Sequence, residues 1–271
     1  MPAKKCNELT VDKGLFPFTS ALVTGASSGI GEAMAHALGR AGVPTVLVAR
    51  RGDRLAELAG LYPGFEVLVA DLTTRVGLDA VCTRIGDVAR PIDLVVNNAG
   101  FGSSGYFDEI DPDRLHDEIA LNVSALVRLS HAAMRVMVER RRGWILNVSS
   151  VAGFQAGPRL AVYAATKAFV TSFSEAVHEE AKRAGVHVTA LCPGLTRTEF
   201  QSVSNTEGLQ RGFPVFAWLT AEKVAVDGLA DCAKGRAISV PGALYKGLVW
   251  GSALLPRAVK RWVYATAMKR G

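Results

Sequence analysis

Seven short apolar runs recur along the chain, and segments with helical spacing lie between them. A run of Val, Leu, Ile and Ala without polar alternation is typical of a strand buried on both faces, as in a parallel sheet covered by helices. The runs are Ala21–Val23, Thr45–Ala49, Val67–Ala70, Leu94–Asn97, Trp144–Val148, Val186–Leu191 and Ala237–Val240. The pattern predicts an α/β fold, a doubly wound parallel sheet (Rossmann fold) of about seven strands with helices on both faces. In such a sheet, ligands bind beyond the carboxyl ends of the strands.

The helical segments are indicated by their apolar spacing and by residues typical of helix ends. They run from about Ala33 to Leu38, from a cap at Asp53 through Leu58, over about Val76 to Ala89, from Asp111 and Pro112 toward Val138, from Leu160 to Ala184, and from Ala221 to Ala233. We expect one domain, because α/β chains of this length commonly form a single core. It divides into an N-terminal extension over 1–19, a core over 20–240 with a substrate lid at about 196–220, and a basic, apolar C-terminal tail over 241–271.

The net charge of +6 is unevenly distributed, because eight basic residues and no acidic one lie from Cys232 onward. The body then carries 23 basic against 25 acidic residues, so nucleic-acid binding is not indicated. The four cysteines form no Cys-x-x-Cys pair and the five histidines show no ligand spacing, so we expect no metal and a reducing, cytoplasmic location. The start lacks the apolar core of a signal peptide. The longest late uncharged stretch, Gly247 to Pro256, is about half as long as a membrane-spanning helix.

Three glycines, Gly25, Gly29 and Gly31, stand between the first strand and the first helix. Glycines in this position let the backbone approach a pyrophosphate, whose charge is met by the amides at the helix N-terminus. A tight turn with small packing residues is the alternative, but the strand–turn–helix context favours a dinucleotide site. We expect the other contacts of this turn to come from Ser27, Ser28 and Ile30.

The end of the second strand discriminates between the two nicotinamide cofactors. An acidic residue there binds the ribose hydroxyl of NAD, whereas an arginine accommodates the 2′-phosphate of NADP. The chain has Arg50 and Arg51 at this place, and no carboxylate lies between the end of the strand and Asp53. The pair therefore predicts NADP(H), with a solvated turn as the alternative. Asp71 follows the third strand, at the level of the adenine.

Tyr163 and Lys167 lie four residues apart, thirteen residues after Ser150. Positions i and i+4 share a helix face, so the ammonium of Lys167 can stabilise the ionised phenol of Tyr163. We therefore expect a tyrosine that exchanges protons near neutral pH, although an ordinary amphipathic pair has the same spacing.

Together these residues resemble the short-chain dehydrogenase/reductase family, over about Leu22 to Val240. The motif Thr24-Gly25-x-x-x-Gly29-x-Gly31 is similar to the family's cofactor turn, and Tyr163-x-x-x-Lys167 to its catalytic pair. The other matches are Asp71 and Leu72 as the adenine contact, Asn98, Ala99 and Gly100 after the fourth strand, Asn122 and Ser150 as catalytic residues, and Pro193, Gly194, Thr196 and Thr198 on the nicotinamide side. The glycine spacing and the length resemble the family's single-domain oxidoreductases.

The resemblance implies an NADP(H)-dependent oxidoreductase that interconverts a carbonyl and an alcohol. Tyr163 would supply the proton in reduction and Ser150 would orient the substrate oxygen. Lys167 would also contact the nicotinamide ribose, and Asn122 would help to hold a water that relays protons. Ser149 competes with Ser150, but the family's spacing to the tyrosine selects Ser150. The alternative is an NADP(H)-binding sensor or scaffold without turnover, against which the intact catalytic residues argue.

Large apolar residues follow Thr198 and favour a hydrophobic carbonyl or alcohol, although they can equally well pack against the body. They are Phe200, Phe213, Val215, Phe216, Trp218 and Leu219, and Phe101, Tyr106 and Phe154 are further candidates. The tail mixes apolar and basic residues like an interfacial helix. It can meet an anionic membrane surface, a neighbouring subunit of a homodimer or homotetramer, or the body of the protein.

Overall fold

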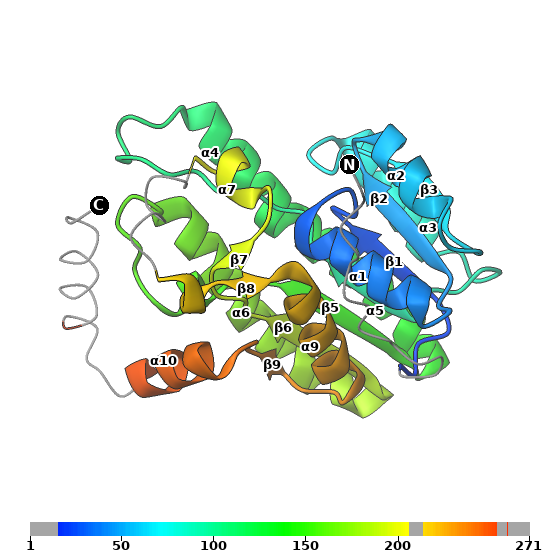
Figure 1. The fold of residues 1–271 in the computed structure, drawn as a ribbon. Helices are drawn as coiled ribbons and strands as arrows, with labels where there is room; N and C mark the ends of the chain where they lie inside the picture. The colour runs from blue at the N-terminus through cyan, green and yellow to red at the C-terminus, as the bar shows by residue number, and fades with distance from the viewer. Residues whose placement is uncertain (1–15, 206–213, 254–258, 260–271) are drawn as a thin grey trace, which may run out of the picture.

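Seven parallel strands form one sheet in the computed structural model, which describes residues 16–205, 214–253 and 259. The strands are β1 (Ala21–Thr24), β2 (Thr45–Ala49), β3 (Glu66–Val69), β4 (Leu94–Asn97), β5 (Gly143–Val148), β6 (Val186–Leu191) and β9 (Ile238–Ser239). Their order in the sheet is β3-β2-β1-β4-β5-β6-β9, and neighbouring strands pair in parallel (Figure 1). From β1, the chain adds β2 and β3 toward one edge of the sheet, and then returns to add β4 and the later strands toward the other edge. Doubly wound sheets bind their ligands at this change, between β1 and β4. The predicted fold is confirmed.

Six helices cover the two faces of the sheet. They are α1 (Gly29–Arg40), α2 (Gly52–Ala59), α3 (Arg75–Ile85), α5 (Leu126–Arg140), α6 (Ala161–Ala181) and α9 (Ala221–Ala233). The helices α1, α2 and α9 share one apolar cluster with the strands, and α3, α5 and α6 share the other. Both faces of the inner strands are therefore shielded from solvent, which explains their continuous apolar sequences.

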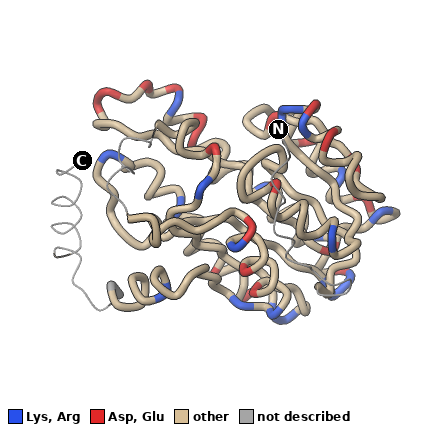
Figure 2. The backbone as a smooth tube through the Cα atoms, viewed as in Figure 1, with Lys and Arg blue, Asp and Glu red and all other residues tan. Residues whose placement is uncertain are grey.

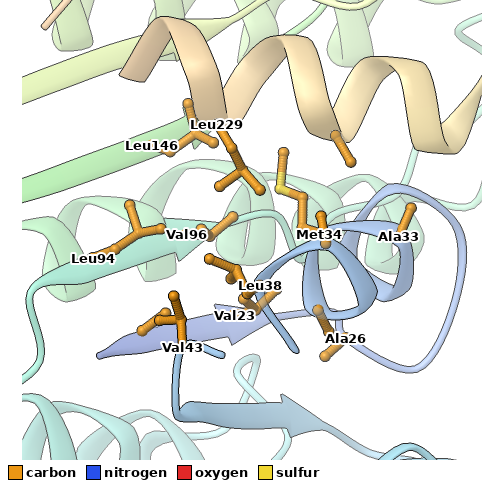
Figure 3. Close-up of a cluster of buried hydrophobic side chains, with 14 of the residues drawn as sticks. Val23, Ala26, Ala33, Met34, Leu38, Val43, Leu94, Val96, Leu146 and Leu229 are labelled. Carbon is orange, nitrogen blue, oxygen red and sulfur yellow. The ribbon is translucent and has the colours of Figure 1, made fainter. Parts of the chain in front are cut away.

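The cluster under α1 and α9 shows how the sheet is sealed (Figure 3). Met34 and Leu38 of α1 and Leu229 of α9 lie over the strands, next to Val96 and Leu146, and each of these side chains is 0% exposed. The edge strand β3 differs, because its burial alternates and one of its faces meets solvent. The core therefore fixes the carboxyl ends of β1, β4 and β5, where the candidate site lies.

The predicted helix boundaries differ from the structure in two places. The helix α2 begins at Gly52, so Asp53 lies in its first turn and Arg51 occupies the cap position. The predicted long helix from Asp111 is divided into α4 (Pro112–Ile119), a π-helical segment η1 (Ala120–Ala125) and α5. A π-helical segment widens one turn without changing the apolar pattern, so periodicity does not reveal it.

The region predicted as a lid contains β7 (Thr196–Arg197), α7 (Phe200–Val203), η4 (Val215–Ala217) and β8 (Leu219–Thr220), and β7 pairs with β8. Two short 3-10 segments, η2 (Val151–Phe154) and η3 (Lys182–Ala184), flank α6.

The first part of the predicted tail forms α10 (Ala243–Ala253), which packs on the body through Tyr245 and Val249. The sequence of α10 contains one charged residue, Lys246. Most charged residues lie on the outer helices and loops of the body (Figure 2). The N-terminal residues 1–15, Phe213, and most of the tail after 253 lie outside the described residues. In the described ranges, no helix is both long enough and apolar enough to cross a bilayer.

Candidate active site

A cavity of about 1800 Å³ lies at the carboxyl ends of the central strands. The glycine turn and the ends of β2 and β3 line one part of it, and η2, α6, the lid segments and α10 line the rest. Every predicted catalytic or cofactor residue lines this cavity except Gly31 and Asn122. The structure thus brings together residues from 25 to 198 that the sequence places far apart.

The glycine turn lies close against the end of β4. Thr24 Oγ1 accepts hydrogen bonds from the backbone N–H groups of Asn98 (2.9 Å) and Ala99 (3.0 Å), and Asn98 Nδ2 donates to the Thr24 carbonyl (2.9 Å). Gly25 has a φ of 64°, and a Cβ there would lie 2.8 Å from Asn98 Nδ2. A Cβ at Gly31 would collide with the Gly25 carbonyl, so Gly31 supports the turn from behind the cavity wall. Both positions therefore require glycine.

The N-terminus of α1 points at the cavity and has no side-chain cap. Ser28 occupies the cap position with extended backbone, but its side chain bonds no helix amide. The first amides of a helix lack partners within the helix, and together with the helix dipole they favour an anion. Since Ser28, Gly29 and Ile30 line the cavity, these residues fit a pyrophosphate.

The two arginines after β2 have different surroundings. Arg51 donates to the Ser27 hydroxyl (3.1 Å) and the Ser27 carbonyl (3.2 Å), and it pairs with Glu199 at 2.9 Å. The Arg50 side chain is 76% exposed, and the carboxylate paired with it, that of Asp71, is 3.9 Å away. Arg50 is thus the better available guanidinium, while Arg51 ties the glycine turn to the lid. The sequence analysis did not identify Glu199, because no local pattern marks a partner 148 residues from Arg51.

Asp71 lies at the far end of the cavity beside Leu72. Its Oδ1 accepts hydrogen bonds from the Thr73 backbone N–H (3.0 Å) and hydroxyl (2.7 Å). Partial burial acts to raise the pKa of Asp71, but the Thr73 bonds and Arg50 outweigh it and lower that pKa. The carboxylate therefore stays ionised and oriented, ready to accept hydrogen bonds from a ligand.

The two serines after β5 have separate surroundings, as expected. Ser149 is buried, and its hydroxyl lies 2.7 Å from both the Lys167 carbonyl and Thr171 Oγ1. Ser150 accepts a hydrogen bond from the Ala152 amide (3.1 Å), and its hydroxyl also interacts with the phenol of Tyr163. Ser149 therefore braces α6, while Ser150 lies beside the tyrosine.

The protonation of Tyr163 differs from the expectation. Burial raises the pKa of Tyr163 to about 12, although the interaction with Ser150 lowers it. Lys167 Nζ lies 5.7 Å from the centre of the tyrosine ring and donates to the Val148 carbonyl at 2.9 Å. Burial also lowers the pKa of Lys167 to about 8. The prediction that Lys167 brings the phenol near neutral titration is thus wrong for this state of the protein, because burial outweighs the effect of Ser150 and Lys167 is not among the groups that shift the pKa of Tyr163.

Asn122 lies in η1 and is 1% exposed. Its Oδ1 accepts from the Phe101 amide (3.1 Å), and its Nδ2 donates to the Phe101 carbonyl (2.8 Å) and to Thr166 Oγ1 (3.2 Å). A Cβ at Gly100 would lie 2.7 Å from Asn122 Oδ1 and 3.6 Å from Lys167 Nζ, so the amide and the ammonium both lie next to this glycine. Asn122 holds the loop after β4 against α6, and its role in a proton relay stays a prediction.

Of the large apolar residues predicted to bind the substrate, some line the cavity and others lie outside it. The phenylalanines that line the cavity are Phe101, Phe154, Phe200 and Phe216, and the Phe200 ring lies 5.4 Å from that of Tyr163. Leu219 packs against the core instead, and Tyr106 is 61% exposed outside the cavity. The sequence analysis did not identify α10, which contributes Leu244 and Leu248 to the cavity wall. Their i, i+4 spacing was the available signal.

Tyr245 of α10 fixes the loop that follows β6. Its hydroxyl accepts from the Leu195 amide (3.0 Å) and donates to the Ala217 carbonyl (2.7 Å). Its ring occupies the space that a side chain at Gly194 would need. The predicted motif from Pro193 to Thr198 is therefore held in place by the segment predicted as a tail.

Comparison with known proteins identifies the family. Residues 19–209 match the model of the short chain dehydrogenase family. An uncharacterized oxidoreductase of Staphylococcus epidermidis is 35% identical over 71% of this chain and 82% of its own length. The very-long-chain 3-oxoacyl-CoA reductase of Mus musculus is 35% identical over 68% of this chain and 61% of its own. A solved short-chain dehydrogenase from Sphingobium yanoikuyae in complex with NADPH is 32% identical, with a TM-score of 0.79 over 86% of this chain and 91% of that one. The chain belongs to the short-chain dehydrogenase family.

Proposed function

We propose that the protein is an NADP(H)-dependent oxidoreductase that interconverts a carbonyl and an alcohol on a hydrophobic substrate. The observation that carries the proposal is the position of Tyr163, which lies beside Ser150 and Lys167 in the same cavity as the glycine turn and the uncapped start of α1. Proton-transfer groups and a phosphate-binding backbone in one cavity suit hydride transfer to a carbonyl.

The residues that would hold the cofactor follow from their contacts. The amides at the start of α1 would bind the pyrophosphate, and Asp71 would bind on the adenine side. The exposed guanidinium of Arg50 would bind a 2′-phosphate, and the relative from Sphingobium yanoikuyae was solved with NADPH, which carries this group. Lys167 Nζ donates a hydrogen bond to the Val148 carbonyl, and since an ammonium carries three donors, the others can reach the ribose. NADP(H), when bound, supplies or accepts the hydride.

Tyr163 is suited to donate a proton in carbonyl reduction. With a pKa of about 12, its phenol holds its proton throughout the neutral range. Ser150 is placed to bond the substrate oxygen and to stabilise the negative charge that develops on it. Tyr163 then becomes a phenolate, and the ammonium of Lys167 is the positive group of this chain nearest to stabilise it. Alcohol oxidation uses the same groups in reverse.

The substrate end of the cavity favours an apolar molecule. Phe101, Phe154, Phe200 and Phe216 face it, and Leu244 and Leu248 of α10 extend the apolar wall. The mouse relative is named for reduction of very-long-chain 3-oxoacyl-CoA, a ketone next to a long apolar chain. We therefore propose long-chain or polycyclic ketones and the corresponding alcohols as the substrate class.

A substrate panel tests the proposal. We expect NADPH oxidation with bulky apolar ketones and long-chain 3-oxoacyl thioesters, and little with short polar sugars. A Phe200→Ala variant should raise KM for the apolar substrates more than it lowers kcat, because it removes binding surface beside Tyr163. Tight NADPH binding without turnover across the panel would instead favour the sensor or scaffold alternative.

We also propose a homo-oligomer, a dimer or a tetramer, in the cytoplasm. Phe169 is 43% exposed on α6 and stacks on Phe173 at 5.9 Å, which leaves an aromatic surface on the outside of the subunit. Light scattering after size exclusion tests this, and a Phe169→Glu variant should shift the mass toward the monomer.

Membrane contact through the C-terminal segment is a separate proposal. Leu248 and Trp250 of α10 are 57% and 63% exposed, and the sequence after α10 contains five basic and no acidic residues. Co-sedimentation with anionic vesicles should decrease in a Trp250→Ser variant. Equal binding to anionic and neutral vesicles would contradict the proposal.

A further inference from the structure

A buried carboxyl group lies next to the catalytic residues and has no role in the proposal above. Glu118, near the end of α4, is 0% exposed. Neither of its carboxylate oxygens has a hydrogen-bond partner of good geometry, although Ser103 lies close enough to lower its pKa. A buried carboxyl group without partners is costly for a fold, because a lost hydrogen bond or an unpaired charge is poorly compensated away from water. Such a group calls for an electrostatic partner nearby.

The nearest guanidinium is committed elsewhere. Arg114, one turn earlier on α4, donates to Ser103 Oγ (3.1 Å) and to the carbonyls of Gly102 (3.1 Å) and Val203 (2.7 Å). Arg114 and Ser103 lower the pKa of Glu118 without forming an ion pair or a well-aligned hydrogen bond with it, and burial acts more strongly in the opposite direction. The third group that lowers this pKa is Lys167.

The helix geometry directs Glu118 toward Lys167. Glu118 precedes Asn122 by four residues, and both are buried while Ile119 between them is 45% exposed. Asn122 Nδ2 donates to Thr166 Oγ1 of α6, and Asn122 Oδ1 and Lys167 Nζ both lie within 4 Å of the Cβ position of Gly100, so the buried face of this helix meets α6 beside the lysine. Tyr163, one turn before Lys167 on α6, is the other α6 group that the charge of Glu118 affects.

Lys167 in turn lacks any other counter-charge in the described part of the chain. The groups that raise its pKa are Glu118 and Cys192, and the pKa of the buried Cys192 thiol is itself raised to about 12. The thiol is therefore neutral at physiological pH and carries no charge to balance an ammonium. Glu118 is left as the carboxylate that can do so, across a separation longer than an ion-pair contact.

We propose that Glu118 is a positioning residue of the active site, whose buried carboxylate is the counter-charge that keeps Lys167 and Tyr163 protonated up to a higher pH than they would reach alone. The two buried charges stabilise each other, since each makes ionisation of the other less unfavourable. The effect on function rests on the proposed oxidoreductase activity, but the electrostatic coupling itself does not.

The coupling has a defined consequence for carbonyl reduction. Reduction requires the proton on Tyr163 and the ammonium of Lys167, and a negative charge at Glu118 raises the pKa of both. Removal of that charge lowers both values, so the alkaline limb of kcat/KM moves to lower pH. If Glu118 only supported the fold, its substitution would lower kcat/KM at every pH and leave the alkaline limb of the profile at the same pH.

NMR of the free protein tests the coupling without cofactor or substrate. The Lys167 side chain is followed by its 13Cε signal, assigned by its loss in Lys167→Arg. In Glu118→Gln we expect the titration midpoint of Lys167 to fall by about one pH unit or more, as for loss of a close opposite charge. The matched control is Asp117→Asn, which removes the same charge from the neighbouring exposed position and should leave the midpoint unchanged. An unchanged midpoint in Glu118→Gln would overturn the proposal.

The wild-type protein provides a second test in case Glu118→Gln does not fold. With 13C-labelled glutamate carboxyl groups, and the Glu118 signal assigned by its loss in Glu118→Asp, the carboxyl should be ionised at neutral pH. A protonated Glu118 at that pH would contradict the proposal. If the coupling is present but no substrate is turned over, the proposed function fails while this inference stands.

Discussion

The sharpest prediction on cofactor choice concerns Arg50. We expect Arg50→Ala to weaken NADPH binding and to leave NADH binding nearly unchanged, because the exposed guanidinium of Arg50 pairs only loosely with Asp71, at 3.9 Å, and would bind the 2′-phosphate that NADH lacks. Arg51→Ala should behave differently. Arg51 holds Ser27 and Glu199, so its loss disturbs the glycine turn and should weaken both cofactors.

The magnitude follows from the surroundings of the side chain. A hydrogen bond to a charged group contributes about 1.5–3 kcal/mol. Arg50 is 76% exposed and solvent screens its charge, so the lower half of that range applies. A loss of about 1.5–2 kcal/mol corresponds to a roughly 10–30-fold increase in the Kd for NADPH.

Titration calorimetry with NADPH and NADH at one fixed ionic strength measures this difference. The matched control is Arg54→Ala, which removes a positive charge from α2 that also pairs with Glu199, at 3.3 Å, but that does not line the cavity. It should change neither Kd appreciably. Equal losses for NADPH and NADH in Arg50→Ala would refute the assignment, as would an Arg54→Ala variant with the same selectivity change.

Further predictions concern the core, the lysine, the lid and the turn. Leu229→Ala should lower the free energy of unfolding in urea by about 2–5 kcal/mol, whereas Leu61→Ala, at a side chain 63% exposed, should change it little. The pKa of Lys167 is about 8 in the folded protein and about 10.4 in the unfolded chain. Burial of its ammonium therefore lowers the free energy of unfolding fully below about pH 8, and this penalty disappears as pH rises from about 8 to about 10.4. Wild-type stability should therefore gain about 1–3 kcal/mol between about pH 7 and about pH 10 relative to Lys167→Met, and a parallel profile would contradict this. Glu199→Gln removes a carboxylate that competes with the cofactor phosphate for Arg51, while Ser27 still holds Arg51 in place. NADPH binding should therefore tighten by about two- to fivefold, as expected for loss of a half-exposed ion pair, and weaker NADPH binding would contradict this. Gly31→Ala should abolish binding of both cofactors while leaving a folded protein by circular dichroism, and normal binding would contradict the close approach at the turn.

The sheet could be predicted because its signal is local. Each inner strand is covered on both faces, so burial appears directly in the sequence as an apolar run. The π-helical segment at Ala120–Ala125 left no such trace, since it inserts a wider turn into a helix whose apolar spacing continues on both sides.

Much of the candidate site could also be placed, because its motifs follow the strands. What the sequence could not provide were contacts between distant residues, such as the Arg51–Glu199 ion pair, and the packing of α10 through Tyr245 onto the loop after β6. The pKa of Tyr163 was predicted in the wrong direction because helix spacing indicates a neighbouring ammonium but not the depth of burial. Glu118 was overlooked for the same reason, because helix spacing does not show how deeply a charged residue is buried.

The central claim is that Tyr163 donates the proton that accompanies hydride transfer. Single-turnover NADPH oxidation with Tyr163→Phe and an accepted ketone tests it most directly. We predict a rate lower by about 10²–10⁴-fold, the usual contribution of a general acid, together with a Kd for NADPH within about twofold of the wild-type value. Single-turnover oxidation at the wild-type rate would contradict the account.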